Sequence, residues 1–92
     1  MDSARLETIK NMLGISGSYH DILLNAYGAE VEQYLIDAGV KEEVLALPEV
    51  TGIYAGGIAD LWNYGAGDGK LSPYFLQRAI QLTLKEVASD GI

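Results

Sequence analysis

Residues 48–62 read PEVTGIYAGGIADLW, and this stretch decides the fold class. Its apolar positions recur at steps of three and four, a spacing that places them on one face of an α-helix. Pro48 suits the first turn of such a helix, where its missing N–H is not needed, and Glu49 is favourable beside the positive end of the helix dipole. The predicted inward face consists of Val50, Ile53, Tyr54, Gly57, Ile58, Leu61 and Trp62.

Three glycines, Gly52, Gly56 and Gly57, lie inside this predicted helix. Each costs about 1 kcal/mol relative to alanine in a helix interior. Glycine also has no side chain, so a second helix can approach its backbone closely. We therefore expect the three glycines to mark a contact between helices.

Upstream, a first helix is predicted over Ser3–Leu13. Asp2 or Ser3 has the residue type of an N-cap, and Gly14 suits the position after the helix, where a positive φ costs glycine little. The apolar positions of this helix are Leu6, Ile9, Met12 and Leu13.

A second and longer helix is predicted over about Tyr19–Ala38, with Ser18 as its N-cap and Gly39 as its stop. Its apolar residues again recur at steps of three and four, while most polar residues fall elsewhere on the helical wheel. The predicted apolar stripe is Tyr19, Leu23, Tyr27, Val31, Tyr34, Leu35 and Ala38.

Downstream of this helix, Val40–Leu47 is expected to form a helical turn or two. Residues 64–70 contain three glycines at alternate positions, which cannot continue a helix cheaply. Ser72 and Pro73 then have the residue types of an N-cap and a first helical position, so a last helix is predicted to run to about Ala88. The residues expected to point inward or toward a neighbouring molecule are Phe75, Leu76, Ala79, Ile80, Leu82, Thr83 and Val87.

The predicted fold class is all-α: a small bundle of about four helices with a Gly-rich loop before the last helix. The signals of strands, namely alternating β-branched runs and Asn-Gly turns, are missing. The 92 residues (9.9 kDa) have room for one core, so a single domain is expected over residues 1–92. A chain of this length buries only roughly 60–65% of its unfolded surface, so we expect marginal stability or stabilisation by a partner.

The composition excludes several kinds of site. The absence of cysteine rules out disulfides and thiol nucleophiles, and a single histidine, His20, rules out a histidine cluster. The N-terminus lacks the basic start and apolar run of a signal peptide. The most apolar stretch, residues 44–62, is interrupted by Pro48, Glu49 and Asp60, so we expect no membrane span and a cytoplasmic protein.

The net charge of −7 would repel the phosphate backbone of a nucleic acid. Charge is also unevenly distributed: from Asp21 to Asp68 the chain has nine acidic residues and one basic residue, Lys41. Two interpretations stay open. This acidic middle is either a solvated surface or a surface turned toward DNA that must pass without sticking.

The glycine loop does not have the spacing of a phosphate-binding or calcium-binding loop. A P-loop requires Ser or Thr after Gly-Lys and an earlier glycine, but Leu71 and Tyr64 stand at those positions. The dinucleotide pattern would require glycine in place of Lys70, and Asp68 alone cannot supply an EF-hand. His20, in the first turn of a predicted helix, is expected to be a surface histidine. We therefore expect no catalytic residue, no cofactor and no metal site.

The most informative segment is residues 58–75, IADLWNYGAGDGKLSPYF, followed by Arg78 and by Gln81-Leu82. It resembles the head–tail connector (adaptor) proteins of tailed bacteriophages, also described as phage DNA-packaging proteins. In that family a helix ends in an Asp-Leu-Trp-Asn-Tyr-like stretch. A glycine loop follows with a Gly-Lys-Leu-Ser-Pro-like exit, and the last helix carries a Gln-Leu-Arg-Gly-like signature. Here Thr83-Leu84 replaces the arginine and glycine of that signature.

The resemblance implies a structural virion protein. Copies of the chain would form a cyclic homo-oligomer, commonly twelvefold, that binds beneath the portal, extends the DNA channel and supports tail attachment. The implied partners are the chain itself, the phage portal protein, a downstream head-completion or tail protein, and genomic DNA that passes without sequence-specific binding; no membrane is involved. The implied location is the virion neck, after assembly in the host cytoplasm from a phage or prophage gene. The alternative is a small non-enzymatic regulatory or adaptor domain that binds one protein partner.

The candidate functional residues are therefore interface residues around the glycine loop. Tyrosine and tryptophan are enriched at protein interfaces because they combine a large apolar body with a polar tip. Trp62 is expected to anchor its helix against the last helix, and Lys70 and Arg78 are expected to meet the acidic middle of an adjacent subunit. The complete set is Trp62, Asn63, Tyr64, Asp68, Lys70, Tyr74 and Arg78.

Overall fold

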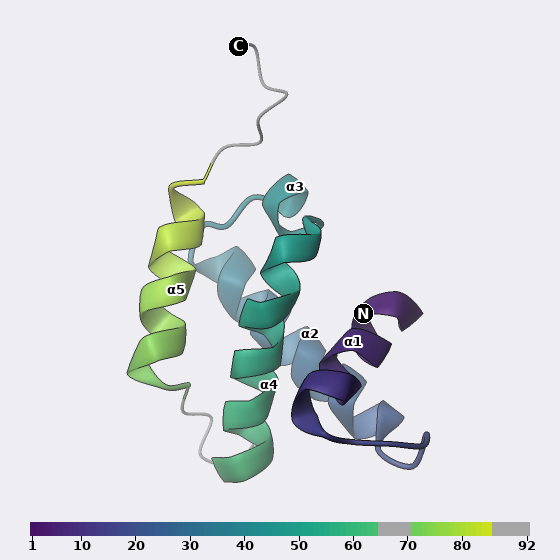
Figure 1. Ribbon diagram of the computed structural model, residues 1–92. Helices are drawn as coiled ribbons and strands as arrows, with labels where there is room; N and C mark the ends of the chain where they lie inside the picture. Colours follow the sequence, from purple (N-terminus) through teal and green to yellow (C-terminus); the bar gives the residue numbers. More distant parts are fainter. Residues whose placement is uncertain (65–70, 86–92) are drawn as a thin grey trace.

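The computed structural model describes residues 1–64 and 71–85 (Figure 1). Helix α4 (Thr51–Tyr64) is the central element, and α1 (Ser3–Leu13), α2 (Asp21–Asp37) and α5 (Pro73–Thr83) all pack against it. In Figure 1, α5 lies along one side of α4, α1 lies on the other side, and α2 lies behind. The short helix α3 (Glu42–Leu45) and the 3₁₀ turn η1 (Pro48–Val50) connect α2 to α4.

All regular structure in the described ranges is helical, so the predicted all-α class is confirmed. The described residues form five α-helices where about four were expected. The additional one is α3, which corresponds to the helical turn predicted within Val40–Leu47. The predicted Gly-rich loop lies outside the described residues, because residues 65–70 belong to the gap before α5.

Helix α1 has the predicted bounds, and local signals account for them. The side chain of Asp2 accepts a hydrogen bond from the backbone N–H of Arg5, so Asp2 is the N-cap. Gly14 ends the helix with φ of 72°, a left-handed conformation in which its N–H returns to the carbonyl of Asn11. Both ends of α1 thus follow from residues within the helix or next to it.

Helix α2 differs from its prediction at its start and in its buried face. It begins at Asp21, and Ser18 is not the cap; the chain turns at this point, with the N–H of Asp21 bonded to the Ser18 carbonyl. The buried residues include Leu24 and Gly28, which were not predicted, while Leu23 is partly exposed. Because two adjacent leucines fit a helical stripe almost equally well, only packing against the other helices selects Leu24. The predicted stripe residues that lie exposed are Tyr19, Leu23, Tyr34 and Ala38.

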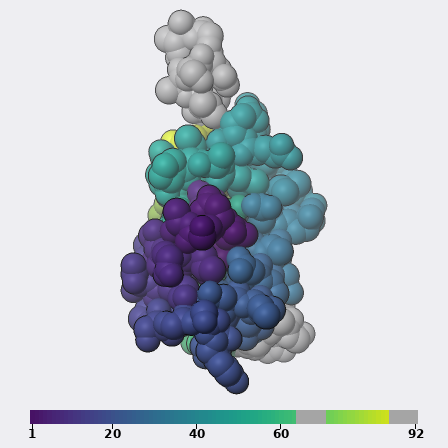
Figure 2. Space-filling model, turned by 90° about the vertical axis from the view of Figure 1, so that its right-hand side faces the viewer, coloured from purple at the N-terminus to yellow at the C-terminus, as the bar shows by residue number. Residues whose placement is uncertain are grey.

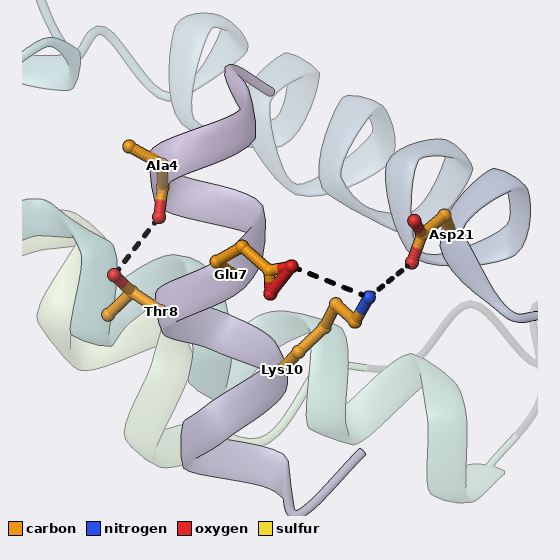
Figure 3. A network of polar contacts seen from close by, with 5 residues as sticks. All are labelled: Ala4, Glu7, Thr8, Lys10 and Asp21. Atoms are coloured by element: carbon orange, nitrogen blue, oxygen red, sulfur yellow. Dashed lines mark hydrogen bonds and ion pairs between the residues drawn. The ribbon is translucent and has the colours of Figure 1, made fainter. Parts of the chain in front are cut away.

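A buried lysine holds the start of α2 against α1 (Figure 3). Lys10 is only 5% exposed, and its Nζ lies 2.8 Å from the Asp21 carboxylate and 3.9 Å from that of Glu7. The hydrogen bond to Asp21 raises the pKa of Lys10 above its ordinary value, because it stabilises the charged ammonium. Asp21 also suits the positive N-terminal end of α2.

Arg5 connects α1 to the segment that leads into α4. Its guanidinium donates to the carbonyls of Leu45 and Leu47, each at 2.9 Å, and its Nε donates to the hydroxyl of Thr51 at 3.0 Å. The guanidinium also lies 4.5 Å from the ring centroid of Tyr54. Arg5 thereby ties α1 to the last residue of α3, Leu45, and to Leu47 directly before η1.

The inward face of α4 is largely the predicted one. Val50, Ile53, Tyr54, Ile58 and Leu61 are buried, whereas Trp62 is half-buried. The phenol of Tyr54 donates a 2.7 Å hydrogen bond to Glu32 on α2. Burial in the core and this bond to a carboxylate both raise the pKa of Tyr54 above its ordinary value.

At Gly57, helix α4 packs closely against Val31 of α2. A Cβ added there would lie 2.8 Å from Cγ2 and 3.2 Å from Cγ1 of Val31, and 3.4 Å from the ring of Phe75. A contact of 2.8 Å is shorter than real Cβ atoms make. The expectation that a glycine of this helix permits a close helix contact is therefore confirmed at Gly57.

Helix α5 starts as predicted and ends early. Ser72 accepts a hydrogen bond from the N–H of Phe75, with Pro73 in the first helical turn. The helix ends at Thr83, not near Ala88, and the Thr83 hydroxyl donates to the Ile80 carbonyl at 2.6 Å. Of the predicted inward residues, Phe75, Ala79 and Leu82 are buried and Ile80 is exposed; Val87 and Ala88 lie outside the described residues.

Candidate protein interface

A groove of about 440 Å³ lies between α4 and α5. Two buried core residues, Ile53 and Phe75, contribute apolar surface to it. Asp60 accepts a 2.9 Å hydrogen bond from the backbone N–H of Ser72, and both residues also line the groove. This bond ties the start of α5 to α4. The remaining lining residues are Gly52, Gly56 and Ala59 of α4 and Tyr74 and Arg78 of α5.

Tyr74 and Arg78 form a polar edge of this groove. They lie four residues apart on α5, so both side chains point to the same side of the helix. The Arg78 guanidinium donates to the Tyr74 hydroxyl at 3.1 Å and lies 5.9 Å from the ring centroid. Tyr74 is 67% exposed. The partner is a hydroxyl and not a carboxylate, so this contact orients the guanidinium without forming an ion pair.

Gly52 and Gly56 leave the α4 wall of the groove open. An added Cβ would meet nothing within 4 Å at Gly56, and at Gly52 only the end of the Met12 side chain at 4.0 Å. Packing within the chain therefore accounts for Gly57 but not for these two glycines. Each still costs about 1 kcal/mol of helix stability relative to alanine. Among the described residues, Gly52 and Gly56 therefore do not make the close helix contact that the sequence predicts.

The structure brings Tyr74 and Arg78 together. The other candidate residues lie apart from this pair or outside the described residues. Trp62 and Asn63 are in the last turn of α4, with Trp62 half-buried against the core and Asn63 exposed. Tyr64 is the last residue of α4. Asp68 and Lys70 lie outside the described residues, and the anchoring of α4 to α5 by Trp62 stays a prediction.

His20 is not the surface residue expected from the sequence. It is half-buried, with its ring 4.9 Å from that of Trp62 and 4.8 Å from that of Tyr19, both in edge-on geometry. The turn before α2 brings His20 against the end of α4. Nothing in the local sequence indicates this contact, because Trp62 is more than forty residues away in the chain.

A second apolar surface lies at the junction of α1 and α2, which Figure 2 shows as a projection at the lower edge of the molecule. Tyr19 is 90% exposed and Ile22 is 87% exposed. Exposed apolar residues gathered in one place indicate an interaction site more often than scattered ones do. Ile22 does not belong to the predicted inward stripe of α2. Its position off that stripe is the feature of the sequence that indicates its exposure. We call this surface the α1–α2 corner; it consists of Tyr19, Ile22 and Leu23, which lie within five residues of the chain.

Three cationic side chains are paired with other groups of the same chain. Arg5 and Lys10 make the contacts described above, and Lys85 forms a 2.8 Å ion pair with Glu49. Glu30, Glu42 and Glu43 are exposed, and among the described residues none of these three takes part in an ion pair. The exposure of these three glutamates agrees with both interpretations of the acidic middle, a solvated surface and a surface turned toward DNA.

A smaller pocket of about 310 Å³ lies at the N-terminus, where Asp2, Glu32 and Glu42 contribute to its lining together with Arg5. Arg5 and Glu32 are already engaged in the hydrogen bonds that hold α3 and Tyr54. Within residues 1–64 and 71–85, no three His, Cys, Asp or Glu side chains converge in a way that would hold a metal ion. In the same ranges, no helix has both the length and the apolar character that crossing a membrane requires.

Comparison with protein-family models, with curated proteins and with solved structures finds no match to this chain. Inference about its function therefore depends on the groove, the corner and the charge distribution, together with the residues of the 58–82 segment.

Proposed function

We propose that the protein is a structural virion protein, a ring-forming head–tail connector subunit of a tailed bacteriophage. In this proposal the ring binds beneath the portal, extends the DNA channel and supports attachment of the next neck or tail protein. In this proposal each subunit is a helical bundle with a Gly-rich loop before α5, and it is located in the neck of the virion. The resemblance of residues 58–82 to connector proteins is its starting point.

The observation that carries the proposal is the pair of unlike surfaces on the chain. The α4–α5 groove has glycines and a cation in its lining, whereas the α1–α2 corner projects apolar side chains. Helices α1 and α5 flank α4 on different sides (Figure 1). Head-to-tail assembly requires two different patches per subunit, each matching the other, and closes into a ring when the rotation between subunits permits.

The acidic surface is consistent with a channel for DNA. Glu42 and Glu43 are exposed at the start of α3. Like charge on the channel wall would keep the DNA backbone from binding as it passes. In assembled particles, reversal of both charges to lysine should slow DNA ejection or retain DNA in the neck; unchanged ejection would remove these two residues from the channel wall.

The direct test of the proposal is native mass spectrometry of the purified chain over a range of concentrations. The measurement is made with the chain alone and with the portal protein encoded beside it. We expect either a ring of the chain alone or portal particles that gain one copy per portal subunit. A chain that stays monomeric and does not bind the portal would refute the connector proposal.

The same groove also permits the alternative, a small regulatory or adaptor domain that binds one protein partner. Its apolar lining and its Tyr74–Arg78 edge suit a single amphipathic helix of another protein. Stoichiometry separates the two functions, because a regulator forms a small closed complex whereas a connector forms a ring.

A further inference from the structure

We propose that the α4–α5 groove receives helix α2 of a second copy of the chain, with Glu30 of that copy placed against Arg78. The inference rests on the proposed function, because it names the partner surface that would join neighbouring subunits. It commits to one occupant, a second copy, and to one register.

The exposed side of α2 has the shape that the groove would accept. Ile22, Ala26, Ala29 and Glu30 are all exposed and lie at steps of four, three and one, so they share one face of the helix. This face has one large apolar side chain at its N-terminal end, two small residues in the middle and a carboxylate beyond them. A narrow face of this kind can lie close to the open glycines of α4.

Charge favours a second copy as the occupant. Among the described residues no carboxylate forms an ion pair with Arg78, whose side-chain partner is the neutral phenol of Tyr74. Asp60 also lines the groove, but it accepts the Ser72 N–H. Glu30 in turn has no ion pair within the described part of its own chain. Docking would place these two charges together, partly removed from water, where an ion pair is stronger than at a free surface.

The register follows from the lengths of the two surfaces. Ile22 and Glu30 are eight residues apart, which is about 12 Å along a helix at 1.5 Å per residue. Gly52 and Ala59 span about 10 Å of α4 on the same rule. Ile22 would therefore lie near Ala59, and Ala26 near Gly56. Glu30 would then reach the part of the groove beside Gly52, with α2 antiparallel to α4.

The placement of the two surfaces makes the contact head-to-tail. Gly57 of α4 faces Val31 of α2, whereas Gly52 and Gly56 line the groove beside α5, so α2 packs on another side of α4 than the groove. One copy cannot fill its own groove with its own α2. The contact also leaves the free groove of one subunit and the free α2 of the next available for further copies, as a ring requires.

The test is a charge exchange in the full chain, with assembly measured by native mass spectrometry and sedimentation velocity, with and without the portal. We expect Arg78→Glu and Glu30→Lys each to weaken self-association about tenfold or more, and the double variant to recover most of that loss. Glu43→Lys is the matched control, because it makes the same change of charge at an exposed position of α3. The combination of Arg78→Glu with Glu43→Lys should not recover assembly.

The absence of cysteine allows a second test of the register. When an Ala26→Cys chain is mixed with a Gly56→Cys chain and oxidised, we expect a disulfide-linked pair, because a disulfide requires Cα atoms within about 7 Å. An Asn63→Cys chain replaces Gly56→Cys in the control mixture and should give no such pair.

The outcomes separate the two proposals. Rings that ignore both charge reversals and give no Ala26–Gly56 cross-link would overturn this inference and leave the connector function standing. Small closed complexes that follow the charge exchange, with neither a ring nor portal binding, would support the inference and refute the connector function. A chain that remains monomeric in every mixture would refute both.

Discussion

Replacement of Gly57 by alanine tests whether the close approach of α4 to α2 governs the stability of the fold. Two opposing effects are expected. Alanine stabilises a helix interior by about 1 kcal/mol relative to glycine. The added methyl group would lie 2.8 Å from Cγ2 of Val31. Val31 is fully buried and β-branched, so it has one strongly preferred rotamer in a helix and cannot move aside cheaply.

The neighbouring residue provides a matched control. Gly56 lies in the same helix, one position earlier, and a Cβ there would meet nothing within 4 Å. Gly56→Ala should therefore stabilise the chain by up to about 1 kcal/mol. Overpacking in a well-packed core costs about 1–3 kcal/mol, so Gly57→Ala should be less stable than Gly56→Ala by that amount. The helix-propensity gain is common to both variants, so the difference isolates the steric cost.

The assay is thermal and urea unfolding of the full chain, followed by circular dichroism at a concentration low enough to keep it monomeric. For a domain of this size, 1 kcal/mol corresponds to about 4–8 °C in Tm, so the two variants should differ by at least about 4 °C. In a Val31→Ala background the difference should shrink, because the overlapping methyl groups are removed. A Gly57→Ala chain that is as stable as the Gly56→Ala chain, with Val31 present, would refute the reasoning.

Three further predictions concern the polar contacts of the core. Arg5→Lys should lower the free energy of unfolding by about 1–3 kcal/mol, because the Leu45 and Leu47 carbonyls lose the guanidinium that donates to them. A urea midpoint equal to that of the unchanged chain would contradict this prediction. Asp21→Asn should lower Tm more than Lys10→Met does. The first change leaves the buried Lys10 ammonium without its main counter-charge, whereas the second removes the ammonium itself. A lower Tm for Lys10→Met than for Asp21→Asn would be evidence against the buried pair. Stability should also fall as the pH rises above about 10, because the unfolded chain then releases protons that folded Tyr54 and Lys10, with their raised pKa values, still hold. Absorbance at 295 nm should show one tyrosine that ionises only with unfolding, and ionisation of every tyrosine in the folded chain would contradict this.

Some features could be predicted from the sequence because their causes are local. The bounds of α1 follow from an N-cap, an apolar period and a terminal glycine that are all adjacent in the chain. The start of α5 follows in the same way from Ser72 and Pro73. The buried face of α4 was predictable because Ile53, Tyr54, Gly57, Ile58 and Leu61 agree on one side of the helix.

Other features depend on partners that are distant in the sequence. The buried face of α2 turns on a choice between Leu23 and Leu24, which helical spacing alone does not make. The hydrogen bonds of Arg5 join α1 to carbonyls some forty residues later, and His20 lies against Trp62 across a similar separation. No local pattern encodes such pairs, because they form only once the helices have packed.

The features of the candidate interface also divide into those that the sequence predicts and those that only the packed structure determines. The sequence by itself determined that the chain is helical, that α4 contains glycines suited to close contact, and that Tyr74 and Arg78 share one side of the last helix. Only the tertiary structure decided that Gly57 serves the core whereas Gly52 and Gly56 stay open beside α5. The physical reason is that glycine permits close approach on any face of a helix, and the arrangement of the neighbouring helices determines which faces are covered.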